Sequence, residues 1–350
     1  MRTFPSESGL KPGFACSVSG TGSAFPVQPF TCTVHSVFRG ALNLRVAGSP
    51  WLCSVVASPA KAHPLAAVMG CDTDFLSWGL EAGTRGTFSG SRLEFQVSPT
   101  VPGMDFSLAL KTPAERICAL DIGDPALQAS LRRSETLLEA FQSKAGTELR
   151  YSTLSGNKTA TNPFEKIFLP AAAALAKVRK QATATKTATT TEATAFTTES
   201  AVGLLRPLIG LGEGLTPTGD DFVAGYLAGL RARAASDWAG NRNRDPGISD
   251  FLEALSSAIL LPDTPLSKSI LSATNDISAA FLACAAKGLF SAALVSFAQA
   301  LGRYTTRSTA LDGADYGRLD STLEAVCNLG HSSGMDVASG FLFGLRSCGE

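Results

Sequence analysis

The chain has 350 residues, and its 30 Lys and Arg residues balance its 30 Asp and Glu residues, so the formal net charge is zero. A neutral chain without a basic block excludes nucleic acid or an acidic membrane surface as its main partner. Charged residues make up only 17% of the chain, a shortage that suits a surface partly covered by other subunits. Part of that shortage is dilution by the Thr/Ala-rich segment 181–200. The length allows for two domains or one large one.

The cysteines and the apolar stretches indicate a cytoplasmic protein. The first residues lack the apolar core of a signal peptide. The most apolar stretch, Ile277–Leu301, is interrupted by Lys287, which favours a buried core helix over a membrane span. Eight cysteines lie far apart with no C-x-x-C pair, as is typical of buried thiols in a reducing compartment; they are Cys16, Cys32, Cys53, Cys71, Cys118, Cys284, Cys327 and Cys348.

Up to about Pro102, short apolar runs are bounded by Gly, Pro and Ser. Such closely spaced runs predict β-strands that form a small barrel or sandwich. The predicted strands lie at Phe30–Phe38, Ala41–Val46, Trp51–Ala57, Thr87–Phe88 and Leu93–Val97.

From Thr112 onward, apolar residues recur at helical spacing. The predicted helices are Pro125–Lys144, Pro163–Lys180, Asp250–Leu261 and Asp276–Leu301. We therefore expect an α+β protein with a β domain at residues 1–110 and a mainly helical domain at residues 111–350. Segment 181–200 offers no apolar face to bury and is interpreted as a mobile insertion or linker. Asp237–Pro246 is expected to be a loop between helices.

An internal repeat links segments 212–230 and 330–345. Glycines recur at a constant spacing (334 − 219, 340 − 225 and 344 − 229 all give 115), and an Asp, an aromatic residue and two leucines keep the same spacing. Each copy is a Gly-rich polar loop followed by a helical pattern. Glycines four residues apart within a helix are unfavourable unless two backbones approach closely. We therefore predict that the two helices pack along these glycines, and that their N-terminal loops converge.

Each copy also fits a capping box, with a hydroxyl at the N-cap and an acid three residues later. The pairs are Thr218 with Asp221 and Ser333 with Asp336. Capping alone is one explanation of these residues. The surplus of glycines and polar groups in the loops favours a second explanation, a ligand site, because free N–H groups and the helix dipole attract anions.

The motifs Gly210–Phe222 and Gly330–Asp336, with Val34–Phe38 and Asn43 near the N-terminus, resemble a bacterial family that includes the AllH-type subunit of oxamate carbamoyltransferase. The resemblance spans about residues 30 to 345, with segment 181–200 as an insertion. Met335 departs from the pattern, which usually has an aromatic residue there. The resemblance implies a subunit of a multi-chain enzyme of purine (allantoin) catabolism. That enzyme converts oxalurate and phosphate into oxamate and carbamoyl phosphate.

This chemistry needs an anion cradle, donors for a tetrahedral oxyanion and a general acid or base. The expected proton-transfer residues are His331, Asp221 and Asp336. Asp220 is the candidate for a Mg²⁺ ion, because the capping box does not use it; no organic cofactor is expected. Residues expected to bind the anionic substrate are Gly212, Gly214, Thr216, Thr218, Gly219, Ser332, Ser333, Gly334, His35, Thr264 and Ser267. Expected partners are the substrate and other enzyme subunits or further copies of the chain.

Simpler explanations remain for several of these residues. His35 lies in a predicted strand and suits a structural role, and Thr264 and Ser267 would equally cap a helix. His63, beside a proline, is expected at the surface. Thr305–Thr309 superficially resembles the phosphate loop of ordinary transcarbamylases, but it follows a helix, so we do not expect that fold. Two other functions stay open: a non-catalytic assembly subunit, and a stand-alone metal-dependent enzyme acting on a small carboxylate or phosphorylated metabolite.

Overall fold

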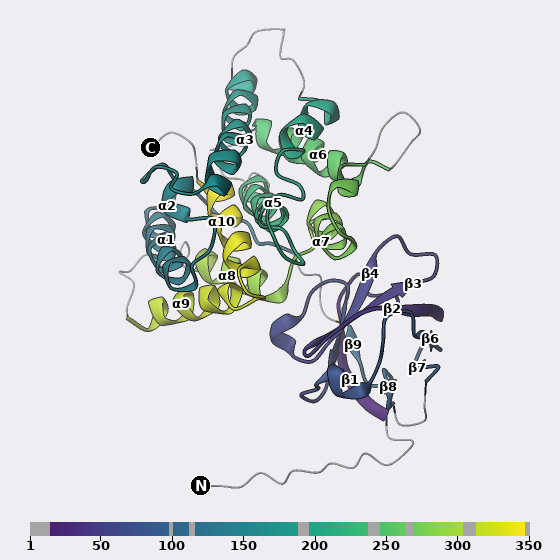
Figure 1. Cartoon of the computed structure of the whole chain (residues 1–350). Helices are drawn as coiled ribbons and strands as arrows, with labels where there is room; N and C mark the ends of the chain where they lie inside the picture. The colour runs from purple at the N-terminus through teal and green to yellow at the C-terminus, as the bar shows by residue number, and fades with distance from the viewer. Residues whose placement is uncertain are drawn as a thin grey trace. The chain divides into compact units, whose positions relative to one another are not determined.

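The structure, a computed structural model, describes residues 15–97, 101–111, 116–187, 196–236, 246–262, 269–303 and 313–346. The chain divides into two compact units, Met1–Glu115 and Arg116–Glu350. The first is a β-barrel and the second is built from helices (Figure 1), which confirms the predicted α+β class.

The barrel closes through its first strand. Neighbouring strands follow the order β5-β4-β3-β2-β6-β7-β8-β1, and β1 pairs again with β5, while β9 adds to β1. The sequence predicted β2, β3, β4, β6 and β7 but missed β1, β5, β8 and β9. The strands are β1 Ala15–Thr21, β2 Phe30–Phe38, β3 Ala41–Val46, β4 Leu52–Val56, β5 Ala66–Met69, β6 Arg85–Phe88, β7 Arg92–Phe95, β8 Gly103–Asp105 and β9 Leu110–Lys111.

Alternating side chains fill the barrel interior. Leu42, Leu44, Leu93 and Met104 are fully buried, as expected where successive residues of a strand face opposite sides of a sheet. Short 3₁₀ turns, η1 (Pro59–Lys61) and η2 (Phe75–Trp78), connect strands.

In the helical unit, the other helices pack around two central ones, α5 and α10 (Figure 1). These two make the most extensive contact of any pair of described elements. Both are apolar almost all round, as expected for helices buried in a core. The helices are α1 Pro125–Ala145, α2 Tyr151–Leu154, α3 Pro163–Thr187, α4 Thr198–Leu205, α5 Thr218–Ser236, α6 Pro246–Leu260, α7 Asp276–Ala286, α8 Ala292–Arg303, α9 Gly313–Cys327 and α10 Ser333–Leu345, with a 3₁₀ turn η3 at Ile270–Ala273.

The predicted single helix over Asp276–Leu301 is wrong, because two helices occupy that stretch. Gly288 adopts a φ of +76°, the left-handed conformation that glycine readily takes after a helix end. Its N–H and that of Leu289 donate to carbonyls of the last turn of α7. The chain therefore turns before α8 begins. None of the described helices is both long and apolar enough to cross a membrane.

The Thr/Ala-rich segment is partly regular, contrary to the prediction for 181–200 as a whole. Residues 181–187 continue α3, and residues 198–200 open α4. Thr197 accepts a hydrogen bond from the Ser200 N–H and so caps α4. Residues 188–195 lie outside the described part of the chain, as do residues 237–245 of the expected loop at Asp237–Pro246.

Candidate active site

The two central helices pack along their glycines, as predicted. A Cβ atom added to Gly225 would lie 2.0 Å from the carbonyl oxygen of Val337. One added to Gly340 would lie 2.0 Å from the carbonyl oxygen of Phe222. Both pairs obey the 115-residue spacing, so each contact is the counterpart of the other. The repeat in the sequence is thus an approximate two-fold symmetry in space.

The next glycines show that the helices run in the same direction. A Cβ atom added to Gly229 would lie 2.9 Å from the Cα atom of Gly344, and the reverse distance is 3.1 Å. Positions 225 and 229 therefore lie along the same seam as positions 340 and 344. Both N-termini consequently reach the same end of the pair, where the positive ends of two helix dipoles add.

The glycines that begin each helix serve packing. A Cβ atom on Gly219 would lie 1.9 Å from the carbonyl oxygen of Leu208, and one on Gly334 would lie 1.8 Å from that of Val326. Their N–H groups donate to the carbonyl oxygens of Leu211 (2.8 Å) and Leu329 (2.9 Å). The expectation that Gly219 and Gly334 offer N–H groups to an anion is therefore wrong.

The predicted capping boxes do not form as expected. Ser332 occupies the N-cap of α10, and its side chain makes no cap hydrogen bond. The first-turn N–H groups of both helices donate instead to the carbonyl oxygens of Pro217 and Ser332. The two carboxylates in these turns, Asp221 and Asp336, are thus available for another role.

Asp221 and Asp336 form a buried carboxyl pair, with exposed fractions of 7% and 1%. Within the described residues, neither oxygen of Asp336 has a hydrogen-bond partner, and Oδ2 of Asp221 has none. Burial first, and then the charge of Asp336, raise the pKa of Asp221 well above its usual value. Burial raises the pKa of Asp336 to about 8, although the hydroxyls of Thr218 and Ser332 lower it and the charge of Glu148 raises it. The pair therefore retains a proton at neutral pH.

Hydroxyl groups from both copies surround the carboxyl pair. Thr216 and Ser333 share a hydrogen bond with 2.5 Å between their oxygens. Both hydroxyls lower the pKa of Asp221, and Thr218 does the same for Asp336. Each acid therefore faces the first hydroxyl of the opposite helix, in keeping with the two-fold symmetry. The predicted convergence of the two loops is confirmed.

The loop before α5, residues 212–216, lies at the surface above this pair. Its two glycines adopt left-handed conformations, with φ of 114° at Gly212 and 102° at Gly214. The Leu215 carbonyl accepts a hydrogen bond from Asn275 Nδ2 (2.8 Å). Within the described part of the chain, the N–H groups of 212–216 donate to no protein acceptor. They remain suited to anion binding, unlike those of Gly219 and Gly334.

Asp220 has a structural environment. It is 1% exposed; its Oδ1 accepts from the Gly210 N–H (2.7 Å), and its Oδ2 accepts from the hydroxyls of Ser278 (2.7 Å) and Thr274. These bonds tie the start of α5 to η3 and α7. A metal ion at Asp220 would have to displace these donors. No cluster of three or more His, Cys, Asp or Glu residues suited to a metal occurs in the described ranges.

The three histidines belong to both units of the chain. His331 is exposed on the loop before α10. His35 belongs to the barrel, where its Nδ1 lies 3.1 Å from the Ser36 hydroxyl. His63 is partly buried, so its predicted surface position is wrong, and burial lowers its pKa to about 4. Thr264 and Ser267 lie outside the described residues, as does the stretch Thr305–Thr309.

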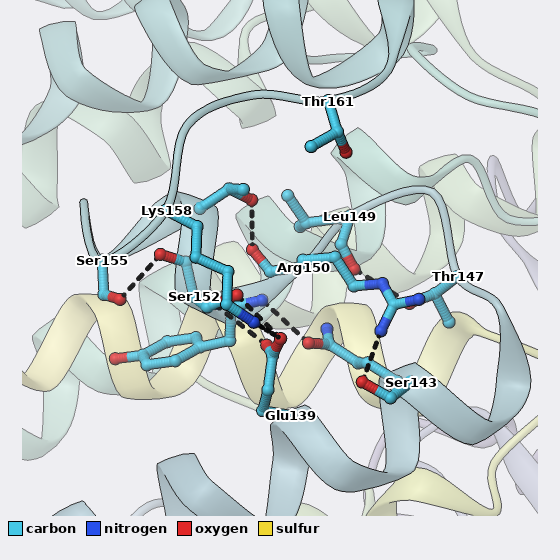
Figure 2. Close-up of polar contacts among 12 residues, drawn as sticks. Glu139, Ser143, Thr147, Leu149, Arg150, Ser152, Ser155, Lys158 and Thr161 are labelled. Atoms are coloured by element: carbon cyan, nitrogen blue, oxygen red, sulfur yellow. Dashed lines mark hydrogen bonds and ion pairs between the residues drawn. The ribbon is translucent and has the colours of Figure 1, made fainter.

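The sequence analysis proposed no functional residue in the segment between α1 and α3. Glu148 lies in this segment, and its charge raises the pKa of Asp336. In Figure 2, Glu139 of α1 accepts hydrogen bonds from the N–H (3.0 Å) and hydroxyl (2.7 Å) of Ser152 and pairs with Lys158. Gln142 extends the network to α10, donating to the Ser339 hydroxyl (3.0 Å). No local motif marks these residues, because partners up to 197 positions apart hold them.

Comparison with protein families gives a match over the region that contains this site. Residues 208–345 match the family described as oxamate carbamoyltransferase subunit AllH, which confirms the resemblance over those residues. The matched range contains both loop–helix copies and the carboxyl pair. No curated protein and no solved structure matches the chain.

Proposed function

We propose that this chain is a subunit of an oxamate carbamoyltransferase, and that Asp221 and Asp336 carry the proton that carbamoyl transfer moves. The observation that carries the proposal is the buried carboxyl pair at the point where two helix N-termini meet, in which three of the four oxygens have no hydrogen-bond partner among the described residues. The family match over 208–345 supplies the reaction class. Oxalurate, oxamate, phosphate and carbamoyl phosphate are the proposed substrates and products.

The reaction requires one proton to change place. A phosphate oxygen attacks the terminal carbamoyl carbon of oxalurate, and a C–O bond forms as the C–N bond to the oxamate nitrogen breaks. That nitrogen needs a proton, whereas monohydrogen phosphate releases one. A carboxyl pair that holds a single proton can donate it to the nitrogen and accept the phosphate proton. The pair is thus restored after each turnover.

The charge of the substrates explains why a protonated pair suits this site. Oxalurate and phosphate are both anions, and two bare carboxylates would repel them. A proton held by the pair removes part of that repulsion, and the paired helix dipoles offset more of it. The unbonded N–H groups of loop 212–216 and the hydroxyls of Thr216 and Ser333 then supply donors for the anion. Because both acids are buried, this loop has to move for substrate to reach them.

The expected Mg²⁺ at Asp220 does not fit the structure well, because hydrogen-bond donors already engage both oxygens of that carboxylate. The proposed mechanism therefore routes no step through a metal. His331, which is exposed on the loop before α10, remains a proposed proton carrier between the solvent and the carboxyl pair. Other subunits of the complex remain proposed partners.

The test measures carbamoyl phosphate formation from oxalurate and phosphate by a complex assembled from this chain and its partner subunits. We expect Asp221→Asn and Asp336→Asn each to lower kcat at least about 100-fold, the size typical of lost acid–base catalysis, while the complex still assembles. His331→Ala is expected to lower kcat less, because solvent can replace an exposed proton carrier.

Glu324→Gln is the matched control, since Glu324 is an exposed acid on α9 of the same unit. It should leave kcat unchanged. If both Asn variants keep full activity in an assembled complex, the proposed catalytic role is wrong, and the chain serves assembly instead. If the assembled wild-type complex forms no carbamoyl phosphate from oxalurate and phosphate, the proposed reaction is wrong.

A further inference from the structure

The barrel holds two neighbouring cysteines beside the pairing of β1 and β5, where it closes. Strand β1 pairs with β5 in antiparallel register, with Val18 opposite Met69. The Gly70 N–H donates to the Ser17 carbonyl oxygen at 2.8 Å, so these two residues form the next pair. Cys16 and Cys71 are the residues that follow on either side, and their side chains are hydrogen-bonded to each other.

These two thiols are in direct contact. The Cys16 and Cys71 side chains share a hydrogen bond, and the Gly70 N–H bond to Ser17 holds the two chain segments together beside them. Cysteines this close can be joined where their Cα atoms lie about 4.4–6.8 Å apart. A Cβ atom on Gly70 would lie only 2.8 Å from the Ser17 hydroxyl, which confirms how closely the strands approach here.

Exposure and electrostatics agree with this placement. Both cysteines are free thiols; Cys71 is exposed and Cys16 is half-buried. Burial and the neighbouring Cys71 thiol raise the pKa of Cys16. Cys71 is therefore the thiol that an oxidant in solution reaches first, and Cys16 is the one positioned to attack it afterwards.

We propose that Cys16 and Cys71 are a covalent modification site, a thiol pair that a disulfide oxidant converts into a cross-strand disulfide. The Cys71 thiolate attacks one sulfur of oxidised glutathione, whose S–S bond breaks and releases one glutathione thiolate. Cys16 then loses its proton and attacks the Cys71 sulfur, releasing the second glutathione. Two protein thiols are oxidised, and one glutathione disulfide is reduced to two thiols.

The proposed disulfide would stabilise the pairing of β1 with β5, which closes the barrel. It joins residues 16 and 71 across a loop that includes β2, β3, β4 and β5. A cross-link over such a loop restricts the unfolded chain and stabilises the folded one. Oxidation is therefore expected to slow opening between β1 and β5 without altering the helical unit.

The experiment treats the full-length, reduced protein with oxidised glutathione and maps its peptides without reduction. We expect a peptide pair joined through Cys16 and Cys71, and an intact mass lower by two hydrogen atoms. Hydrogen exchange of the β1 and β5 amides should slow at least about tenfold after oxidation. Cys16→Ser and Cys71→Ser should each abolish the joined pair, whereas Cys284→Ser, which removes a thiol from α7, should retain it.

Three results would overturn the proposal: Cys71 held only as a mixed disulfide with glutathione, Cys16 joined to another cysteine, or both thiols still free after treatment. Mapping of the wild-type protein gives each of these results directly. The conclusion therefore does not depend on whether either serine variant folds.

Discussion

The two loop–helix copies share their helices but differ in their loops. Along α5 and α10, the glycines and the acids Asp221 and Asp336 keep one spacing and make equivalent contacts. Before the helices, the spacing changes, because the chain from Gly212 to Gly219 is three residues longer than the chain from Gly330 to Gly334. The longer loop carries Thr216 and the N–H groups that have no acceptor within the described part of the chain.

A second difference lies one residue before each acid. Asp220 in the first copy accepts hydrogen bonds from η3 and α7, whereas its counterpart Met335 is buried among apolar side chains. The symmetric residues thus build the helix pair and its carboxyl pair, and the asymmetric residues attach that pair to different surroundings. Residues that keep the two-fold symmetry therefore have a structural role in the helix pair, and residues that depart from it differ in function between the two copies.

The largest expected effect comes from breaking the symmetric seam. Gly225→Ala and Gly340→Ala each place a Cβ atom 2.0 Å from a backbone carbonyl. Neither helix can yield without separating from the other, so each change should lower the free energy of unfolding by more than about 3 kcal/mol. Urea titration measures this, and the two losses should be similar.

Gly317→Ala is the control for this comparison. Gly317 lies in α9, and no atom lies within 4 Å of an added Cβ. Alanine there should stabilise the protein by up to about 1 kcal/mol through helix propensity. Equal losses at all three glycines would contradict the close-packing explanation.

A smaller effect is expected from the carboxyl pair and depends on pH. The pKa of Asp336 is about 8 in the folded protein, whereas an unperturbed Asp side chain, as in the unfolded chain, has a pKa of 3.8. The folded protein therefore holds a proton that the unfolded chain releases. The stability from this proton is complete below about pH 4 and is lost as the pH rises towards 8. Relative to Asp336→Asn, the wild type should lose about 3 kcal/mol between about pH 5.5 and pH 8.

Urea titrations of both proteins at the two pH values test this prediction. Asp221→Asn should change the profile in the same direction, because the pKa of Asp221 is also raised. Parallel pH profiles for the wild type and both variants would show that the pair holds no proton.

The asymmetric acid gives the third prediction. Asp220→Asn replaces an acceptor of three hydrogen bonds with a group that presents an NH₂ to donors. We expect a loss of about 2–3 kcal/mol of unfolding free energy, measured by urea titration. Thr274→Val removes one of the donors and should cost less, about 1 kcal/mol. An Asn variant as stable as the wild type would contradict the structural role of Asp220.

The smallest expected effect concerns the hydrogen bond between the loops. Thr216→Val and Ser333→Ala each remove the bond between these hydroxyls, and each should cost about 1 kcal/mol. In a double-mutant cycle, the two losses should not add, because they remove the same bond. Ser257→Ala is the control, since Ser257 is exposed on α6 of the same unit, and it should cost less than about 0.5 kcal/mol.

Local patterns predicted most elements, but only where neighbouring residues decide the outcome. Strands β2 and β3 and the start of α1 follow directly from alternating or helical spacing. The break between α7 and α8 was missed, because one glycine in an apolar run gives a weak signal. Strand β1 was missed because its partners, β5 and β8, lie more than 45 residues away in the chain.

The sequence by itself determined that two helices pack along matched glycines and bring two loops together, because repeated spacing is a property of the chain. Only the tertiary structure decided what each residue does there. The acids expected to cap helices became a buried pair in which three of the four oxygens have no hydrogen-bond partner among the described residues. The acid expected to bind metal accepts three hydrogen bonds instead. The reason is physical: burial and partners from distant segments set the state of a carboxylate, and neither can be read from its neighbours in the chain.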